Sequence, residues 1–175
     1  MRYGHKVGTP MELLDKFLDL LNEEIHLYES LLSTFQKEKQ AVIQSNLEAL
    51  NESVKEKENL FLKIRILEEQ RMAFLERLSD TLEQPARSLT LTTLSRLLED
   101  PYAARIRNCQ SSFLSLAQSI QEINLSNKAL LHHSLNLVRS SLNLLNDLIP
   151  ANPVYYPSGK MHPGDQSGRV LSGEV

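Results

Sequence analysis

The feature that most limits what this chain can fold into is the near absence of helix breakers. Between residues 11 and 149 the sequence has no glycine and only two prolines, Pro85 and Pro101. In a helix interior glycine costs about 1 kcal/mol and proline about 3 kcal/mol relative to alanine, so long helices exclude both. Leucine supplies most of the apolar surface, and tryptophan is absent. The sequence therefore predicts an all-α fold built from long helices.

The clearest helix is predicted between Pro101 and Ile149, where Asp100 suits the N-cap and Pro101 the first turn. Its apolar positions alternate three and four residues apart, the spacing of a helix that packs along its length. This first seam consists of Ile106, Cys109, Phe113, Leu116, Ile120, Ile123, Asn127, Leu130, Ser134, Leu137, Ser141, Leu144 and Leu148. A second seam lies beside its last part and consists of Leu131, Leu135, Val138, Leu142, Leu145 and Ile149.

Two further long helices are predicted over residues 11–44 and 47–82. The first carries two adjacent apolar seams, which indicates two neighbouring helices. Ser45 and Glu48 have the spacing of a capping box, so we expect a tight reversal and an antiparallel hairpin. The alternative is one helix that continues through residue 45. The seam predicted for the second helix begins Leu47, Leu50, Val54, Lys57, Phe61, Ile64 and then shifts to Leu67, Arg71, Phe74, Leu78, a pattern typical of a coiled-coil stutter.

Between these helices and the last one, residues 89–98 predict a short connector helix with Thr90, Thr92 or Thr93 as its cap. The expected architecture is an elongated, coiled-coil-like bundle in which a third long helix joins an antiparallel helical hairpin. Residues 1–10 are expected to form a flexible N-terminus, and residues 11–149 the helical bundle domain. Residues 150–175 are rich in glycine, proline and serine, and we expect a flexible, disordered C-terminal tail.

Charge and composition exclude several classes of partner. The formal net charge is −3, which gives no reason to expect binding to nucleic acid or to an anionic membrane. No apolar run suits a signal peptide or a membrane span, so we expect no membrane insertion. The single cysteine, Cys109, excludes an internal disulfide and fits a reducing cytoplasm.

Chemical sites are weakly indicated. Glu23 and His26 have the Glu-x-x-His spacing of di-iron bundles, but no other histidine follows a glutamate by three residues, so His26 is expected on the surface. His132 and His133 are adjacent and point about 100° apart on a helix, which does not converge on one metal. Cys109 falls on the seam and should behave as a small buried side chain. We therefore expect no metal, no cofactor and no enzymatic activity, and disfavour a metal-dependent bundle enzyme.

The last predicted helix is longer than the other two, so part of its apolar surface has no helix of the bundle beside it. At about 1.5 Å per residue it spans roughly 70 Å, against roughly 50 Å for each arm of the hairpin. Residues 134–149, which carry the second seam, are at risk of exposure, and a bare apolar strip of this kind usually receives a partner. We expect a groove for a partner's amphipathic helix. The alternatives are dimerisation or packing on the first helix, and we expect a monomer or weak dimer.

Two short motifs carry a resemblance to a known family. Asn124-Leu125-Ser126-Asn127-Lys128-Ala129-Leu130-Leu131 resembles the Asn-x-x-Asn-Gly-x-Leu-Leu/Ile signature of the FlgN-type flagellar export chaperones, and Tyr155-Tyr156-Pro157-Ser158-Gly159 resembles their Tyr-Gly-x-x-Gly tail motif. The order of long and short helices is similar too, so the resemblance covers roughly residues 11–160. Two glycines of the family pattern are replaced, by Lys128 and Tyr156.

The resemblance implies a function. Such chaperones bind the C-terminal helical segments of flagellar hook-associated (hook–filament junction) proteins in the cytoplasm, prevent premature association and deliver them to the flagellar type III export apparatus. It implies that the substrate contacts lie at Asn127, Leu130, Leu131, Leu135, Val138, Leu142, Leu145 and Ile149. Tyr155 and Gly159 would dock on the export gate, although Tyr155 packing on the helix end is an alternative. A structural coiled-coil adaptor that self-associates is the alternative function.

Overall fold

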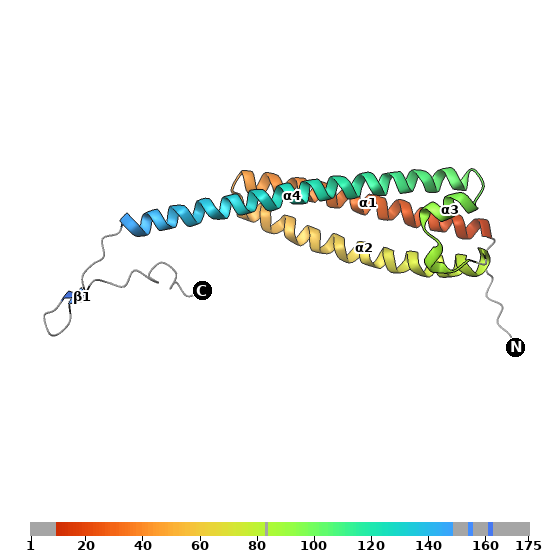
Figure 1. The fold of residues 1–175 in the computed structure, drawn as a ribbon, viewed down its shortest axis with the longest axis horizontal. Coiled ribbons are helices and arrows are strands. Elements are labelled where there is room, and N and C mark those ends of the chain that lie inside the picture. Colours follow the sequence, from red (N-terminus) through yellow and green to blue (C-terminus); the bar gives the residue numbers. More distant parts are fainter. Residues whose placement is uncertain (1–9, 83, 149–153, 156–160, 163–175) are drawn as a thin grey trace. The chain divides into compact units, whose positions relative to one another are not determined.

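A computed structural model describes residues 10–82, 84–148, 154–155 and 161–162. Helices dominate the described chain, as the sequence predicts, and Figure 1 shows their order. The elements are α1 (Pro10–Ile43), α2 (Leu47–Leu82), the 3-10 turn η1 (Ala86–Ser88), α3 (Leu91–Leu97), α4 (Tyr102–Leu148), β1 (Val154–Tyr155) and β2 (Met161–His162). The predicted all-α class and the three long helices are therefore confirmed.

The chain divides into two compact units, and the division falls inside α4 between Leu130 and Leu131. The first unit contains α1, α2, η1, α3 and the start of α4. The second contains the rest of α4 and the two short strands. The predicted domain of residues 11–149 stays a prediction.

The hairpin between α1 and α2 turns at residues 44–46. Ser45 has a positive φ of 54°, a conformation that ends α1 and excludes one continuous helix. The next residue, Asn46, caps α2, because its Oδ1 accepts a hydrogen bond from the Ala49 backbone N–H at 3.0 Å. The capping residue predicted from the sequence, Ser45, is thus wrong by one position, since a residue in the left-handed region cannot serve as the extended N-cap.

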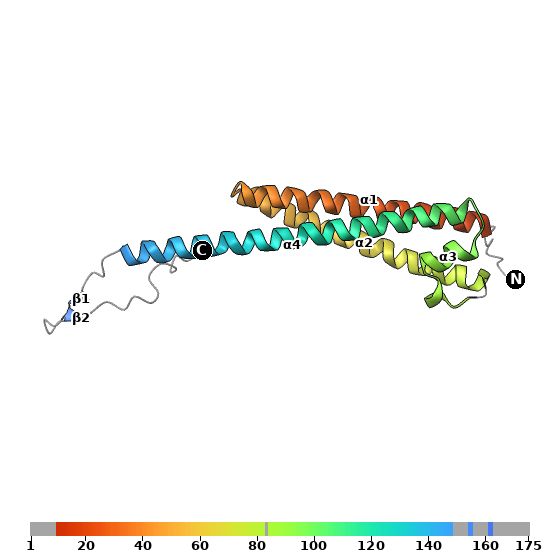
Figure 2. The same cartoon turned by 45° about the horizontal axis from the view of Figure 1, so that its top comes forward.

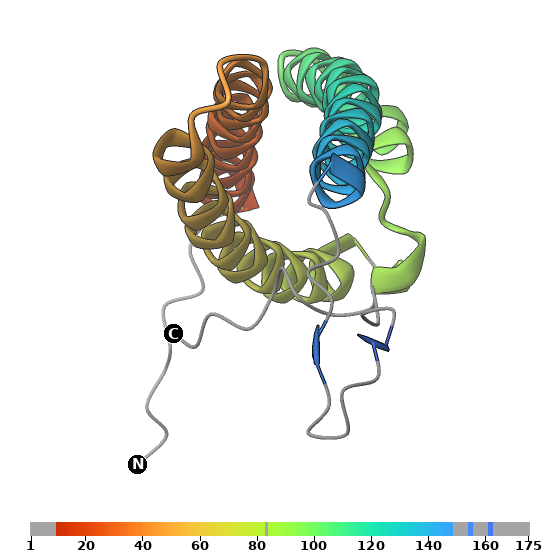
Figure 3. The ribbon, with the colours of Figure 1, turned by 90° about the vertical axis from the view of Figure 1, so that its left-hand side faces the viewer.

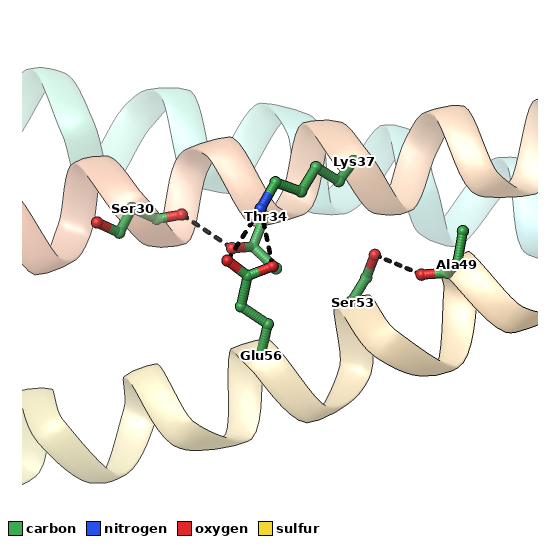
Figure 4. A network of polar contacts seen from close by, with 6 residues as sticks. All are labelled: Ser30, Thr34, Lys37, Ala49, Ser53 and Glu56. Atoms are coloured by element: carbon green, nitrogen blue, oxygen red, sulfur yellow. Dashed lines mark hydrogen bonds and ion pairs between the residues drawn. The ribbon is translucent and has the colours of Figure 1, made fainter.

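Small polar side chains line the hairpin interface near this turn, as Figure 4 shows. Thr34 and Ser53 are buried, and each hydroxyl donates to a carbonyl four residues earlier on its own helix, at 2.9 Å and 2.8 Å. On the rim, Nζ of Lys37 donates to both carboxylate oxygens of Glu56 at 3.0 Å. Because the buried hydroxyls satisfy themselves locally, the interface includes them without an unpaired donor.

The buried face of α2 differs from the predicted seam. Val54 and Phe61 are exposed, Phe61 by 52%, while their neighbours Ser53 and Leu60 are buried. From Leu50 to Arg71 the inward positions alternate three and four apart, so the stutter predicted before Leu67 is absent: Leu50, Ser53, Lys57, Leu60, Ile64, Leu67 and Arg71. After Arg71 both Phe74 and Leu75 face the core before Leu78. The prediction was wrong because it chose the more apolar residue of each adjacent pair.

At its C-terminal end α2 diverges from α1, and η1 and α3 lead from the end of α2 to α4, with α3 beside α4 (Figures 1 and 3). Leu89 and Leu94 from this connector are buried in one cluster with Leu18, Leu78 and Ile106. Thr90 caps α3, as predicted among the three threonines, and accepts a bond from the Thr93 backbone N–H at 3.2 Å. The connector thus closes the core at this end of the first unit.

The N-terminal half of α4 packs along α1 and runs in the same direction (Figure 2). Near its start Arg105 contacts Asp15 at 3.1 Å, and near Leu130 the Asn127 side chain reaches the Phe35 backbone oxygen. The helix begins at Tyr102, one residue later than predicted, so Asp100 does not occupy the predicted N-cap position, although its Oδ1 accepts a hydrogen bond from the Ala104 backbone N–H at 3.1 Å. Ile120 and Ile123 pack against a second cluster formed by Leu31, Phe35, Leu60 and Ile64.

In the second unit, β1 and β2 pair antiparallel, with Val154 opposite His162 and Tyr155 opposite Met161. This pairing was not predicted, since a flexible tail was expected over residues 150–175. Residues 149–153, 156–160 and 163–175 lie outside the described residues.

Candidate functional site

An exposed apolar strip lies on the part of α4 that belongs to the second unit, Leu131–Leu148, and we call it the α4 strip. No residue in this segment is buried. Its large apolar side chains are exposed by 42% to 69%: Leu135, Leu137, Val138, Leu142, Leu144, Leu145 and Leu148. A strip of this extent is well beyond the isolated leucine that any surface carries.

The α4 strip is one continuous face of the helix. At 100° per residue the two seams lie side by side and cover about half of the circumference. The opposite half carries His132, His133, Asn136, Arg139 and Asn143, all exposed. Apart from its histidines, the segment has only two ionisable residues, Arg139 and Asp147. The strip can therefore recognise another amphipathic helix by apolar packing, with little electrostatic attraction.

Five of the eight predicted substrate-contact residues lie on the α4 strip. Leu135, Val138, Leu142 and Leu145 lie together on the strip, and Leu131 at its start is half-buried. Leu130 is half-buried in the first unit. Ile149 and Gly159 lie outside the described residues, and Tyr155 is described only as part of β1.

Asn127 is placed differently from the prediction. Its side chain is 1% exposed, and both hydrogen bonds of its Nδ2 are internal, to the Phe35 backbone oxygen at 2.8 Å and to Oε2 of Glu38 at 2.9 Å. A partner helix cannot reach an amide enclosed in this way. The prediction that Asn127 contacts a substrate is therefore corrected: it is an interior residue.

Asn127 belongs to a polar layer that links all three long helices of the first unit. Glu38 of α1 is 5% exposed, and its other oxygen, Oε1, is paired with Nζ of Lys57 from α2. The same ammonium lies 4.9 Å from the centroid of the Phe35 ring, within the range of a cation–π contact. The polar layer consists of Glu38, Lys57 and Asn127. Lys57 and Asn127 lie on predicted seams, but their pairing with Glu38 was not predicted.

A second polar pair lines a cavity of about 420 Å³ bounded by α1, α2, the α3 cap and α4 of the first unit. Glu24 is 2% exposed, and its Oε2 lies 3.2 Å from Nε of Arg71, although the two are not aligned as a hydrogen bond. Burial raises the pKa of the Glu24 carboxyl above its ordinary value, and the Arg71 guanidinium partly offsets this rise. Burial, and then the Glu68 carboxylate, likewise raise the pKa of Tyr28.

Cys109 and His26, which the sequence singled out as candidates for chemistry, lie where they were predicted to lie. Cys109 is buried in the first core cluster, as predicted, and burial raises the pKa of its thiol, which disfavours the reactive thiolate. His26 is exposed, as predicted, and contacts Glu29 at 2.9 Å. Within the described residues no three His, Cys, Asp or Glu side chains are grouped as metal ligands would be.

Apolar exposure is not confined to the α4 strip. Phe61, Leu62 and Ile66 are also exposed on α2. At 100° per residue, charged Arg65 and Glu69 lie between Phe61 and Leu62 on the helix surface, so these residues do not form a continuous apolar face. No helix in the described part of the chain is long and apolar enough to cross a membrane.

Comparison with known proteins identifies the family. Residues 11–163, most of the chain, match a family model described as FlgN protein. No curated protein and no solved structure matches the chain significantly. The matched range covers α1 from its second residue onward, the other three helices and both short strands of the described structure. The chain therefore belongs to the FlgN protein family, a family of flagellar export chaperones.

Proposed function

We propose that the α4 strip binds the C-terminal amphipathic helices of flagellar hook-associated proteins in the cytoplasm, prevents their premature association and presents them to the export apparatus. The observation that carries the proposal is the exposure of the seven Leu and Val side chains of the strip in a chain of the FlgN family. A terminal helix that later buries its apolar face in an assembled filament is prone to aggregate while that face is bare. A complementary strip covers it temporarily.

The expected affinity follows from the need to release the substrate. Covering a large apolar side chain contributes up to about 1.5–3 kcal/mol, and ordering both helices opposes this gain. Because the strip is nearly uncharged, electrostatic attraction adds little. We expect dissociation constants between about micromolar and tens of nanomolar, or roughly −8 to −10 kcal/mol.

Delivery to the export gate is proposed to involve the tail motif at Tyr155 and Gly159. Aromatic side chains are effective anchors in short recognition segments. Replacement of Tyr155 by Ala should leave substrate affinity and melting unchanged while impairing export. A loss of thermal stability would instead favour packing of Tyr155 on the helix end.

The alternative function, a self-associating coiled-coil adaptor, rests on the same strip. A nearly neutral apolar face can pair with a second copy of itself in an antiparallel arrangement. Light scattering of the purified chain at micromolar concentration, with and without a substrate peptide, separates the two functions. A stable dimer that the peptide does not dissociate would favour the adaptor.

The central test introduces charge on the strip and, in a matched control, one residue away on the polar face. Leu135→Asp with Leu142→Asp should weaken binding of a peptide from a hook-associated protein's C-terminus by 100-fold or more, because each carboxylate is buried without a partner. Asn136→Asp with Asn143→Asp adds the same charge to the opposite face and should change affinity less than about threefold. Titration calorimetry measures both, and equal losses in the two variants would reject the strip as the binding site.

A further inference from the structure

We propose that Asn127 is a positioning residue that fixes the register of α4 on the hairpin and so keeps the α4 strip free for a partner. The inference deepens the proposed function and rests on it only for the link to partner binding. The register itself is a property of the first unit and is testable without any partner.

Apolar burial alone does not select the register of α4. Its first seam keeps the same alternation of three and four residues from Ile106 to Leu148. A helix with such a repeat can slide by seven residues and still present a seam to the same neighbours, which is why coiled coils need polar residues to specify alignment. In α4 the first seam continues into the α4 strip. A shifted helix could therefore pack residues of the strip against the hairpin in place of the residues that pack there now.

The polar layer distinguishes the possible registers. The seam positions seven residues apart in this part of α4 are Phe113, Ile120, Asn127, Ser134 and Ser141. Only Asn127 carries an amide, whose NH2 group has two donors, and both are used, one on the Phe35 carbonyl and one on Glu38. Ile120 in its place would offer no donor, and Ser134 only one on a shorter side chain.

A wrong register therefore leaves a buried acceptor unpaired. Glu38 is 5% exposed, and with its Oε1 paired to Lys57 its Oε2 depends on Asn127. An unsatisfied buried carboxylate oxygen opposes a slide in either direction. A slide that brings Ser134 to the layer would also take one heptad of the strip against the hairpin and remove it from a partner.

The sharpest test exchanges the two side chains, Asn127→Ser with Ser134→Asn, and so keeps the composition constant. Spin labels on Cys replacements at exposed Gln36 and Gln121, in a Cys109→Ala background, report the position of α4 relative to α1. The native sequence should give one distance. The exchanged sequence should add a second population in which α4 is displaced by roughly 10 Å, the rise of seven helical residues. We expect that population to be a minority, because the short link after α3 requires the first turns of α4 to unwind.

A second variant guards against misfolding of the first. Asn127→Leu with Glu38→Leu removes both interdependent polar groups, and the Lys57 ammonium can extend to solvent. It should melt no lower than the native chain, show a broadened distance distribution and bind the substrate peptide about 10-fold more weakly. A single unchanged distance in both variants would overturn the inference. If the native chain binds no peptide, the proposed function fails, yet the distances still decide the register.

Discussion

The two halves of α4 carry the same heptad pattern, but the seam side chains of one half are buried and those of the other half are exposed. In Tyr102–Leu130 the seam residues Ile106 and Cys109 are buried against the hairpin, whereas in Leu131–Leu148 the seam residues Leu137 and Leu144 are exposed. The repeat is the same in both. A heptad seam thus predicts that its side chains are to be covered, but it does not say whether the covering surface belongs to the same molecule.

The halves differ more clearly in their polar residues. The packed half has a buried amide, Asn127, whose partners lie on α1, while the free half has Ser134 and Ser141 at the corresponding seam positions. A buried amide is specific because it requires particular partners. Serines on an exposed helix require none. Specific alignment therefore resides in the packed half, and tolerance of an incoming helix resides in the free half.

The largest expected effect tests the burial difference directly. Ile106→Ala should lower the free energy of unfolding by about 2–5 kcal/mol, because it opens a cavity in a fully buried site. Leu144→Ala, a similar truncation on the same seam, should change it by less than about 0.5 kcal/mol. Urea denaturation followed by circular dichroism measures both. A loss at Leu144 comparable to that at Ile106 would show that the free half is covered in solution.

The next effect concerns the polar layer that only the packed half meets. Lys57→Ala leaves the Glu38 carboxylate buried with one ionic partner fewer, and we expect a loss of about 3 kcal/mol. Lys37→Ala breaks an exposed ion pair between α1 and α2, the one with Glu56, and should cost about 0.2–1 kcal/mol. Thermal melts of the two lysine variants provide the comparison, and equal shifts would contradict the role given to the layer.

A smaller effect is expected from the pH dependence of the packed unit. Burial raises the pKa of Glu24 in the folded chain, so the folded state binds a proton more readily than the unfolded state. The contribution of Glu24 to stability therefore falls as pH rises from the unfolded value of 4.5 through the higher folded value, and at pH 7 the charged form is unfavourable. Glu24→Gln should remove this slope, because the amide does not titrate. An unchanged slope between pH 4 and pH 7 in melting experiments would argue against it.

The smallest effect concerns ionic strength and the free half. With only Arg139 and Asp147 as fixed charges on the segment, substrate affinity should change less than about threefold between 50 mM and 500 mM salt. Fluorescence anisotropy with a labelled peptide is sufficient. A loss of 10-fold or more on adding salt would indicate that charged residues outside the α4 strip make the main contacts.

Much of the fold follows from the sequence because long seams and scarce helix breakers leave few alternatives. The bounds of α2 were predicted to the residue, and those of α1 to within one. What the sequence did not reveal are the buried polar positions. On α1 one of the two apolar rows consists of Phe17, Leu20, Leu27 and Leu31. The same spacing of three and four residues also places Glu24, Thr34 and Glu38 in this row, and all three are buried. Glu24 and Glu38 are recognised as buried only when their partners on other helices are known, whereas Thr34 bonds to Ser30 of its own helix.

The same limit explains the outcome at the candidate site. The exposed strip was predictable, because it depends on the length of α4 and on apolar periodicity within one helix. The interior position of Asn127 was not, because it depends on Phe35 and Glu38, about 90 residues away in the sequence. Likewise Asn46 caps α2 because Ser45 adopts a positive φ, a backbone conformation that a serine in the sequence does not indicate.

The parallel alignment of α4 with α1 has a consequence for how the chain assembles. Contacts across the hairpin near its turn join residues 19 apart, as in Lys37 and Glu56, whereas Asp15 and Arg105 are 90 apart. Nearby segments meet sooner, since closing a longer loop loses more chain entropy. We expect the hairpin to close while the ribosome is still synthesising α4. The last helix then packs onto the closed hairpin through its N-terminal half, while the apolar side chains of its C-terminal half stay exposed.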